Sequence, residues 1–165
     1  MTAAAQSALY RAGVGIVLLN RDGKVWVGER IDAPGRWQLP QGGMIEGEDP
    51  VSAALRELRE ETGVASVELL AESRDWLSYD LPADIARRMW GGRYRGQRQK
   101  WFLFRFVGGD REIDLGAHTC EFSAWRWTDF DALPGLAIAF KRKLYEALVR
   151  EFGALAKQRN RGADS

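Results

Sequence analysis

The sequence has little sulfur or imidazole from which to build a reactive centre: it holds one cysteine and one histidine in 165 residues. Cys120 has no second cysteine to pair with, which excludes an internal disulfide framework and a cysteine-rich zinc site. We expect Cys120 to be a small apolar filler in a reducing compartment. His118 lies in the loop-like stretch GAHTCEF, where we expect it to be solvated and without a catalytic role. The sequence therefore argues against histidine-based acid–base chemistry and zinc chemistry.

Long apolar runs are also missing. No segment reaches the roughly 20 apolar residues that a membrane-spanning helix requires. The N-terminal MTAAAQSALYRAG lacks the basic start and the apolar centre of a signal peptide. We therefore expect a cytoplasmic protein with neither a membrane nor a disulfide partner.

No sign of charge dominates, since 24 Lys and Arg residues face 23 Asp and Glu residues. The distribution is more informative than the total. Acidic residues cluster at 46–61, and basic residues cluster at 87–100 and 141–143. An acidic cluster near basic ones is typical of a metal site that serves an anionic substrate.

The chain length predicts one domain, and the sequence shows no repeat and no linker. We expect a flexible tail at 1–8, a domain at 9–157 and a second flexible tail at 158–165. Apolar and alternating segments predict strands at 14–19, 24–30, within 66–82, at 100–108 and at 122–130, with NRDG at 20–23 making the first two a hairpin. We interpret 31–43 as a loop with a short edge strand around Trp37, and 83–97 as a mobile excursion. Strands and helices in this order predict a mixed α/β sandwich. For the oligomeric state, we favour a monomer.

Two helices have clear signals. Asp49 can cap a helix, Pro50 suits its first turn and Gly63 can end it. The face expected to pack on the core consists of Val51, Ala54, Leu55, Leu58 and Thr62. The helical spacing of Phe140, Leu144, Leu148 and Phe152 predicts an amphipathic helix near the C-terminus.

Glu57, Glu60 and Glu61 share another face of the first helix. Like charges at these spacings repel, at a cost of a few tenths of a kcal/mol per pair. A hard cation such as Mg²⁺ or Mn²⁺, which prefers oxygen ligands, would turn this repulsion into coordination. Arg56 is placed to pair with Glu60 or with Glu48. The alternative is a solvated acidic face on a surface helix.

The spacing around these glutamates resembles the Nudix box in every specified position. It runs Gly42, five residues, Glu48, seven residues, Arg56-Glu57-Leu58, one residue, Glu60-Glu61, one residue, Gly63-Val64. The resemblance implies the Nudix α/β/α sandwich with a mixed β-sheet. It also implies hydrolysis of a phosphoanhydride in a nucleoside diphosphate linked to another group, by a water that Mg²⁺ or Mn²⁺ activates, with more than one ion per site.

The resemblance also assigns roles to the residues of the box. Glu57, Glu60 and Glu61 match metal ligands, and Arg56 and Glu48 match orienting residues. Gly42 and Gly43 lie where backbone carbonyls reach the metal. We count Arg56 with the catalytic residues, together with Glu57, Glu60, Glu61 and Glu121.

Segments outside the box extend the resemblance over nearly the whole chain. YRAGVGIVLLN, WQLPQGG, WLSYDLP, GQRQKWFLF, EFSAWRW and FKRKLYEAL look like a subgroup that contains bacterial RNA 5′-pyrophosphohydrolases and plant-type asymmetrical diadenosine tetraphosphate hydrolases. Glu121 then matches a remote metal ligand or general base. The residues that match a phosphate channel are Arg11, Arg30, Gln41, Gln97 and Lys100, with Lys141 also able to meet phosphate. Tyr79 and Phe140 match aromatics that stack on a base, although Phe140 also fits core packing.

The resemblance leaves several functions open. An RNA 5′-pyrophosphohydrolase that converts 5′-triphosphate RNA to 5′-monophosphate RNA is favoured by the interleaved basic and aromatic stretch RRMWGGRYRGQR at 87–98, although this stretch is equally compatible with a solvated surface loop. An asymmetrical diadenosine tetraphosphate hydrolase is equally compatible with the motifs. A non-catalytic nucleotide- or RNA-binding module is disfavoured because all three box glutamates are present. A house-cleaning nucleoside triphosphatase is disfavoured by the motifs outside the box.

Overall fold

A computed structural model describes residues 8–118 and 120–163 of the chain. The expected N-terminal tail at 1–8 lies almost wholly outside these residues. The strands are β1 (Tyr10–Leu19), β2 (Val25–Arg30), β3 (Trp37–Gln38), β4 (Gln41–Gly43), β5 (Val67–Glu72), β6 (Leu77–Asp80), β7 (Gly96–Phe106) and β8 (Phe122–Thr128). The helices are α2 (Pro50–Thr62), α3 (Ala83–Arg88), α4 (Leu133–Leu136) and α5 (Arg142–Ala163), with short 3₁₀ turns η1 (Met89–Gly92), η2 (Asp110–Glu112), η3 (Phe130–Ala132) and η4 (Ala139–Lys141).

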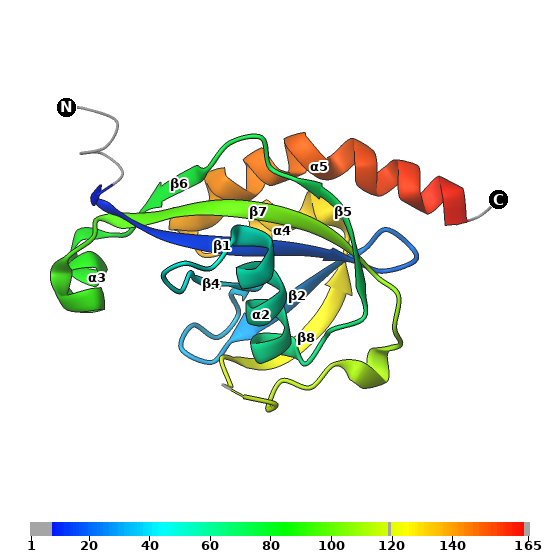
Figure 1. Cartoon of the computed structure of the whole chain (residues 1–165), viewed down its shortest axis with the longest axis horizontal. Helices are drawn as coiled ribbons and strands as arrows, with labels where there is room; N and C mark the ends of the chain where they lie inside the picture. The colour runs from blue at the N-terminus through cyan, green and yellow to red at the C-terminus, as the bar shows by residue number, and fades with distance from the viewer. Residues whose placement is uncertain (1–7, 119, 164–165) are drawn as a thin grey trace.

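The strands form one mixed sheet. Its main order is β3-β2-β1-β7-β5, while β4 pairs with β1, β6 with β7 and β8 with β2. β1 and β7 run parallel from Tyr10 beside Gly96 to Leu19 beside Arg105, and the other pairs are antiparallel. Figure 1 shows α5 along one side of the sheet and α2 crossing in front of β1 and β2. The expected α/β sandwich with a mixed sheet is confirmed.

Alternating residues of the central strands face the two helices. On the α2 side, Val14, Ile16 and Leu18 of β1 and Phe102, Phe104 and Phe106 of β7 pack around Leu58. On the α5 side, Val17 and Leu19 of β1 and Trp101 and Leu103 of β7 pack around Leu144, Tyr145 and Leu148. This period of two is that of a strand covered on both faces. The two apolar clusters hold α2 and α5 in fixed positions on the sheet.

Some local predictions are confirmed in detail. Asn20 Oδ1 accepts hydrogen bonds from the backbone N–H of Asp22 (2.9 Å) and of Lys24 (3.0 Å), which closes the β1–β2 hairpin. Asp49 caps α2 by accepting from Ser52 N at 3.2 Å, and Gly63 ends the helix at a φ of 78°. The chain therefore enters and leaves the glutamate helix as its sequence predicts.

Other segments have more regular structure than the sequence predicted. Residues 83–97, expected to be a mobile excursion, form α3, η1 and the start of β7, which pairs at Gly96 with both Tyr10 and Asp80; the mobility itself stays a prediction. β4 was missed, since its two glycines have little strand propensity and enter the sheet through backbone pairing with Gly13 and Val14. Residues 158–163, expected in a tail, continue α5 to Ala163; the domain boundary itself stays a prediction.

The core face of α2 also differs from the expected one. Leu55 is 41% exposed, whereas Ala53 and Leu58 are fully buried and Glu61 is only 2% exposed. The helix is thus rotated toward its glutamates, so that one of the carboxylates lies in the protein interior. This rotation follows from the approach of α2 to the β4 backbone, described below.

The rotated face predicts a difference between two leucines of the same helix. Leu58→Ala should lower the free energy of unfolding by about 2–5 kcal/mol, because it opens a cavity in the α2 cluster. Leu55→Ala should change it by less than about 0.5 kcal/mol, since that side chain is largely in water. Urea unfolding measures both values, and equal losses would contradict the orientation of α2.

Candidate active site

Arg56 lies at the centre of the glutamate helix and of the loop before it. Its guanidinium makes five hydrogen bonds. Nε and Nη2 donate to the two oxygens of Glu48 at 2.9 Å each. Nη1 donates to Glu57 at 2.9 Å and to Glu60 at 3.3 Å, and Nη2 donates to the carbonyl of Gly43 at 2.9 Å. All the donor positions of the guanidinium are directed into this one cluster.

These bonds explain how the helix tolerates its like charges. The predicted pairing of Arg56 with Glu48 and with Glu60 is present, and Glu57 is a third partner. The hydrogen bonds from Arg56 are the main cause that lowers the pKa of Glu48 to about 2, and the backbone N–H of Ile45 adds to the effect. Arg56 therefore ties the loop before α2 to the carboxylates on the helix.

Glu61 is the buried member of the cluster. Its Oε2 accepts a hydrogen bond from the backbone N–H of Gln41 at 3.0 Å. Burial raises the pKa of Glu61 well above its ordinary value, and the carboxylates of Glu121 and Glu57 raise it further. Burial also raises the pKa of Glu57, against which the hydrogen bond from Arg56 acts. A buried carboxylate with two like-charged neighbours is an environment that favours a bound cation.

Gly42 brings the β4 backbone against this cluster. A Cβ at Gly42 would overlap the carboxylate of Glu57, so only glycine allows the strand and the helix to approach this closely. Antiparallel pairing of Gly42 with Val14 and of Gly43 with Gly13 fixes this backbone to β1. The carbonyl of Gly43 accepts from Arg56, so Arg56 also orients the backbone group that the sequence assigns to a metal.

The fit of this cluster to a divalent cation rests on the oxygen donors and on the burial of Glu61. Among the described residues, no three Asp, Glu, His or Cys side chains converge into a closed ligand set. The carboxylates of Glu57 and Glu60 instead meet at Arg56, whose Nη1 donates to both. Glu121 is exposed, and its charge acts on both Glu57 and Glu61. The oxygen-rich donor set suits a hard cation, and the four-glutamate ligand set stays a prediction.

A basic group lies beside the acidic cluster. Lys141 is 2% exposed, and its Nζ donates to Gln38 Oε1 at 2.8 Å. Arg30 Nη1 donates to the same oxygen at 3.3 Å, and Asp32 holds the other side of its guanidinium at 2.6–2.7 Å. Burial, together with the charge of Arg30, lowers the pKa of Lys141 to about 7. The structure thus brings together Lys141 and Arg30, two residues expected to meet phosphate; that role stays a prediction.

Gln38 and Asp32 are residues of this group that the sequence analysis missed. Gln38 connects Lys141 and Arg30. It lies 103 positions from Lys141 and 8 positions from Arg30 in the sequence. No spacing rule links such residues, because Arg30 lies in β2, Gln38 in β3 and Lys141 in η4, and only the fold brings these three elements together. The only signal was the position of Gln38 within the WQLPQGG segment.

A buried tyrosine connects the two groups. Tyr79 is 7% exposed, and its hydroxyl accepts from Gln97 Nε2 at 2.6 Å and from Gln41 Nε2 at 3.3 Å. Its ring stacks on Phe140 with the centroids 6.0 Å apart. Phe140 is half-buried: part of its side chain packs against the α5-side core, and the rest is exposed. Core packing and the predicted stacking on a base are therefore compatible with each other. The amide oxygens of Gln41 and Gln97 are buried and accept no hydrogen bond within the described part of the chain.

The remaining predicted channel residues lie at the edges of the site. Arg11 lies against Gly43, where a Cβ would overlap its guanidinium. Lys100 points away: its Nζ donates to the carbonyl of Arg74 at 3.3 Å, and its odd–even position on β7 places it on the opposite face from Gln97. The structure therefore separates Lys100 from the other predicted channel residues.

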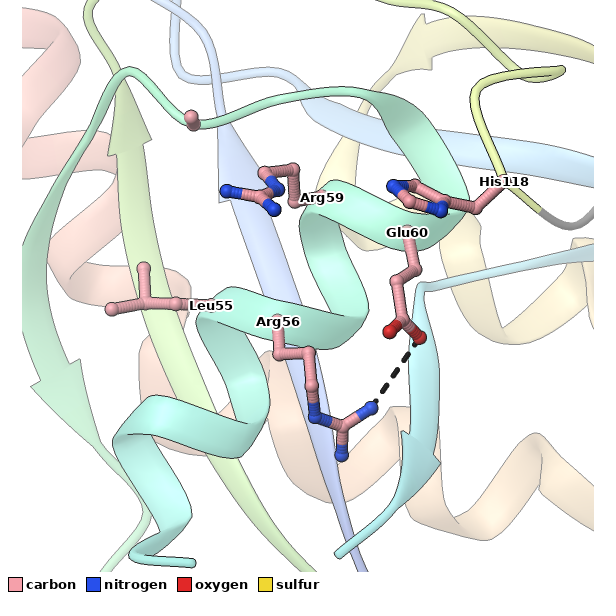
Figure 2. Close-up of a pocket in the computed structure, with 6 residues that line it drawn as sticks. Leu55, Arg56, Arg59, Glu60 and His118 are labelled. Carbon is pink, nitrogen blue, oxygen red and sulfur yellow. Dashed lines mark hydrogen bonds and ion pairs between the residues drawn. The ribbon is translucent and has the colours of Figure 1, made fainter. Parts of the chain in front are cut away.

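His118 and Cys120 lie beside residues of the carboxylate cluster, His118 next to Glu60 (Figure 2) and Cys120 directly before Glu121 in the chain. Figure 2 shows His118 beside Glu60 at a hollow of about 340 Å³ on the outer side of α2, lined also by Leu55, Arg56 and Arg59. His118 is exposed, as expected. The expectation that Cys120 is a buried filler was wrong: Cys120 is exposed, because it precedes β8 in an open loop, where its Sγ lies 3.5 Å from the carbonyl of Phe122.

Comparisons with known proteins identify the family. The NUDIX domain matches residues 9–148, so the chain belongs to the NUDIX domain family. The chain is 52% identical over 147 residues to a protein of Rhodospirillum rubrum named RNA pyrophosphohydrolase, covering 89% of each chain. It is 53% identical over 158 residues to a protein of that name from Rhodopseudomonas palustris, covering 90% of each.

Solved structures show the same fold at lower identity. An E. coli dihydroneopterin triphosphate pyrophosphohydrolase superposes with a TM-score of 0.68 at 24% identity, over 87% of this chain and 99% of that chain. A C. elegans Ap4A hydrolase in a binary complex superposes with a TM-score of 0.64 at 18% identity, over 87% and 98%. These structures show the fold alone; the family match and the relatives at about 52% identity make the chain a Nudix hydrolase, an enzyme of phosphoanhydrides, and such enzymes generally use divalent metal ions. None of the helices in the described segments is long and apolar enough to cross a membrane.

The burial of Glu61 predicts a gain in stability on loss of its charge. The raised pKa means that the folded state holds the proton of Glu61 more tightly than the unfolded state, so stability falls as pH rises above about 4. In the absence of divalent cations, Glu61→Gln should raise the melting temperature at pH 7 by at least about 2 °C.

The gain should shrink toward pH 4, where the wild-type carboxyl is protonated. Glu68→Gln, at an exposed position on β5, is the matched control and should leave the melting temperature unchanged. If Glu61→Gln lowers the melting temperature at pH 7, the interpretation that the charge of Glu61 is buried without compensation is contradicted.

Proposed function

We propose that the protein is an RNA 5′-pyrophosphohydrolase, which converts 5′-triphosphate RNA to 5′-monophosphate RNA. The observation that carries this proposal is identity of about 52% over about nine-tenths of the chain with relatives named RNA pyrophosphohydrolase. The site is consistent with it, because a carboxylate cluster lies beside a buried lysine and an arginine that suit a polyphosphate.

We assign the metal ligands to Glu57, Glu60, Glu61 and Glu121, with the carbonyls of Gly42 and Gly43 as further oxygens. The cations are Mg²⁺ or Mn²⁺, more than one per site. A divalent cation in such a site lowers the pKa of bound water and neutralises charge on phosphate oxygens. Arg56 holds Glu57 and Glu60 in place and, through Glu48, fixes the loop that carries Gly43.

The basic residues of the chain position the polyphosphate. Lys141 and Arg30 present two cations near Glu61 and Glu121, and Arg11 adds a third beside Gly43. Phe140 supplies the aromatic surface on which the first bases stack. In phosphoryl transfer such positioning and charge stabilisation do most of the catalytic work, so these residues matter as much as the carboxylates.

The proposed activity is tested by two substrates assayed side by side with Mg²⁺. A short 5′-triphosphorylated RNA should be hydrolysed with a higher kcat/KM than diadenosine tetraphosphate. Glu60→Gln should lower kcat by about 100-fold or more on the RNA, since it removes a carboxylate that holds the cation. Glu68→Gln should have no effect, because this exposed carboxylate lies on β5.

Each other result identifies a different function. Faster cleavage of diadenosine tetraphosphate would make the protein a dinucleoside polyphosphate hydrolase. Inactivity on both substrates with any divalent cation would indicate that the protein is a non-catalytic nucleotide- or RNA-binding module.

The pKa of Lys141 predicts how substrate affinity depends on pH. Because its pKa is about 7, Lys141 loses its charge as pH rises above 7, and bound phosphate favours the charged form. KM for the RNA should therefore rise between pH 7 and pH 9, by up to about tenfold per unit. Lys141→Met should show a high KM with little pH dependence in this range.

The control for this profile is Lys143→Met, which removes an exposed amine two positions along the chain. It should keep the wild-type profile. An unchanged profile in Lys141→Met would exclude Lys141 as the titrating group.

A further inference from the structure

Four side chains form a continuous series of contacts at the end of the sheet where α3 projects (Figure 1). The Arg11 guanidinium lies 4.8 Å from the ring centroid of Trp90. The ring of Trp90 meets that of Tyr94 edge to face at 6.0 Å, and the Arg93 guanidinium lies 5.3 Å from the ring of Tyr94. We call Arg11, Trp90, Tyr94 and Arg93 the guanidinium–aromatic ladder.

The inner end of the ladder touches the catalytic loop, and its outer end is at the surface. Arg11 packs against the backbone of Gly43, whose carbonyl accepts from Arg56. Trp90 packs against the same core cluster as Phe140. Arg93 is exposed and Tyr94 half-exposed. The ladder therefore leads outward from the site in which the 5′ end is placed.

The ladder carries positive charge that no acid neutralises. Within the described ranges 8–118 and 120–163, no carboxylate forms an ion pair with Arg11 or with Arg93. Arg88 and Arg95 differ, since Arg88 pairs with Asp84 at 3.6 Å and Arg95 with Asp80 at 2.6 Å, whereas Arg87 and Arg98 also form no ion pair with a described residue. The acids of this segment thus leave the two ladder arginines available to an external anion.

The backbone of the ladder shows a second sign of function. Trp90 has a φ of 50°, and it is the one non-glycine residue with a positive φ among those described. Gly91 and Gly92 follow it with φ values of 69° and 73°. A bulky side chain rarely adopts this conformation, which costs conformational energy, and such residues cluster at binding sites. The turn holds the indole under Arg11 at that cost.

We propose that the guanidinium–aromatic ladder binds the single-stranded RNA that follows the first nucleotides of the substrate. The inference rests on the proposed function. Guanidinium groups stacked on aromatic rings keep their N–H edges free for phosphates, and aromatic side chains stack on bases of any identity. RNA supplies both groups repeatedly along one chain, whereas a mononucleotide or a dinucleoside polyphosphate has no phosphodiester-linked nucleotides that follow the first.

The test compares two substrates of different length. One is a triphosphorylated dinucleotide and the other a triphosphorylated ten-nucleotide RNA without secondary structure. Tyr94→Ala and Arg93→Ala should each raise KM for the ten-nucleotide RNA by about tenfold, with kcat changed less than twofold. Neither should change KM for the dinucleotide, which also shows that the site is intact. Tyr94→Phe should retain the wild-type KM, because the ring is kept.

Salt dependence separates the two kinds of contact. Arg93→Ala should reduce the slope of log KM against log salt concentration by about 0.7 on the longer RNA, the value for one phosphate contact to a single strand. Tyr94→Ala should leave the slope unchanged.

A second arginine–aromatic pair provides the matched control. The Arg98 guanidinium lies 4.3 Å from the ring of Trp76. Arg98 follows Gln97 on β7, so its side chain leaves the opposite face of the sheet from Gln97 and Tyr79. Arg98→Ala removes the same charge as Arg93→Ala, and it should leave KM for both RNAs unchanged. Equal effects of the two variants would overturn the ladder proposal.

Failure of the ladder and failure of the proposed function give different results. Hydrolysis of both RNAs with no dependence on Tyr94 or Arg93 would reject the ladder alone. Absence of hydrolysis by the wild type would reject the proposed function, and the ladder is then decided by fluorescence anisotropy of a 3′-labelled ten-nucleotide RNA with a 5′-hydroxyl. Weaker binding of this RNA by Arg93→Ala, but not by Arg98→Ala, would support the ladder; equal binding by all three proteins would overturn it.

Discussion

The hydrogen bonds of Arg56 are the interaction on which the site depends. One guanidinium joins the loop before α2, the backbone of β4 and two carboxylates of the helix. The planar fork of arginine can hold these partners at once, which a lysine cannot. Because Glu57, Glu60 and Glu48 are bound to the same group, the repulsion among them is offset, and the side chains are pre-organised for a cation.

The geometry of β4 and α2 follows from this cluster. The glycine at position 42 lets the strand lie against Glu57, and α2 is rotated so that Glu61 enters the interior while Leu55 is left in water. The fold accepts a buried carboxylate that opposes stability and favours metal binding. The buried Lys141, with its pKa lowered to about 7, is a similar case on the side where we place the polyphosphate. Both groups show a site that trades stability for function.

The sequence predicted the parts of the molecule that depend on local chemistry. The caps at Asp49 and Gly63, the hairpin at Asn20 and the alternation of β7 follow from the preferences of neighbouring residues. The spacing of the box identified the family without the structure. The features that the sequence could not predict depend on tertiary contacts. The strand at Gly42 forms through pairing with β1, and Gln38 contacts Lys141, which lies 103 positions away in the sequence.

We propose that Arg56 organises a carboxylate cluster that binds a divalent cation. This proposal is tested most directly by titrating Mn²⁺ into the wild type and into Arg56→Lys, with free Mn²⁺ measured by electron paramagnetic resonance. Mn²⁺ should bind the variant about 10–100-fold more weakly, because a lysine keeps the charge but not the bonds to Glu48, Glu57 and Gly43. Equal affinity in the two proteins would contradict it.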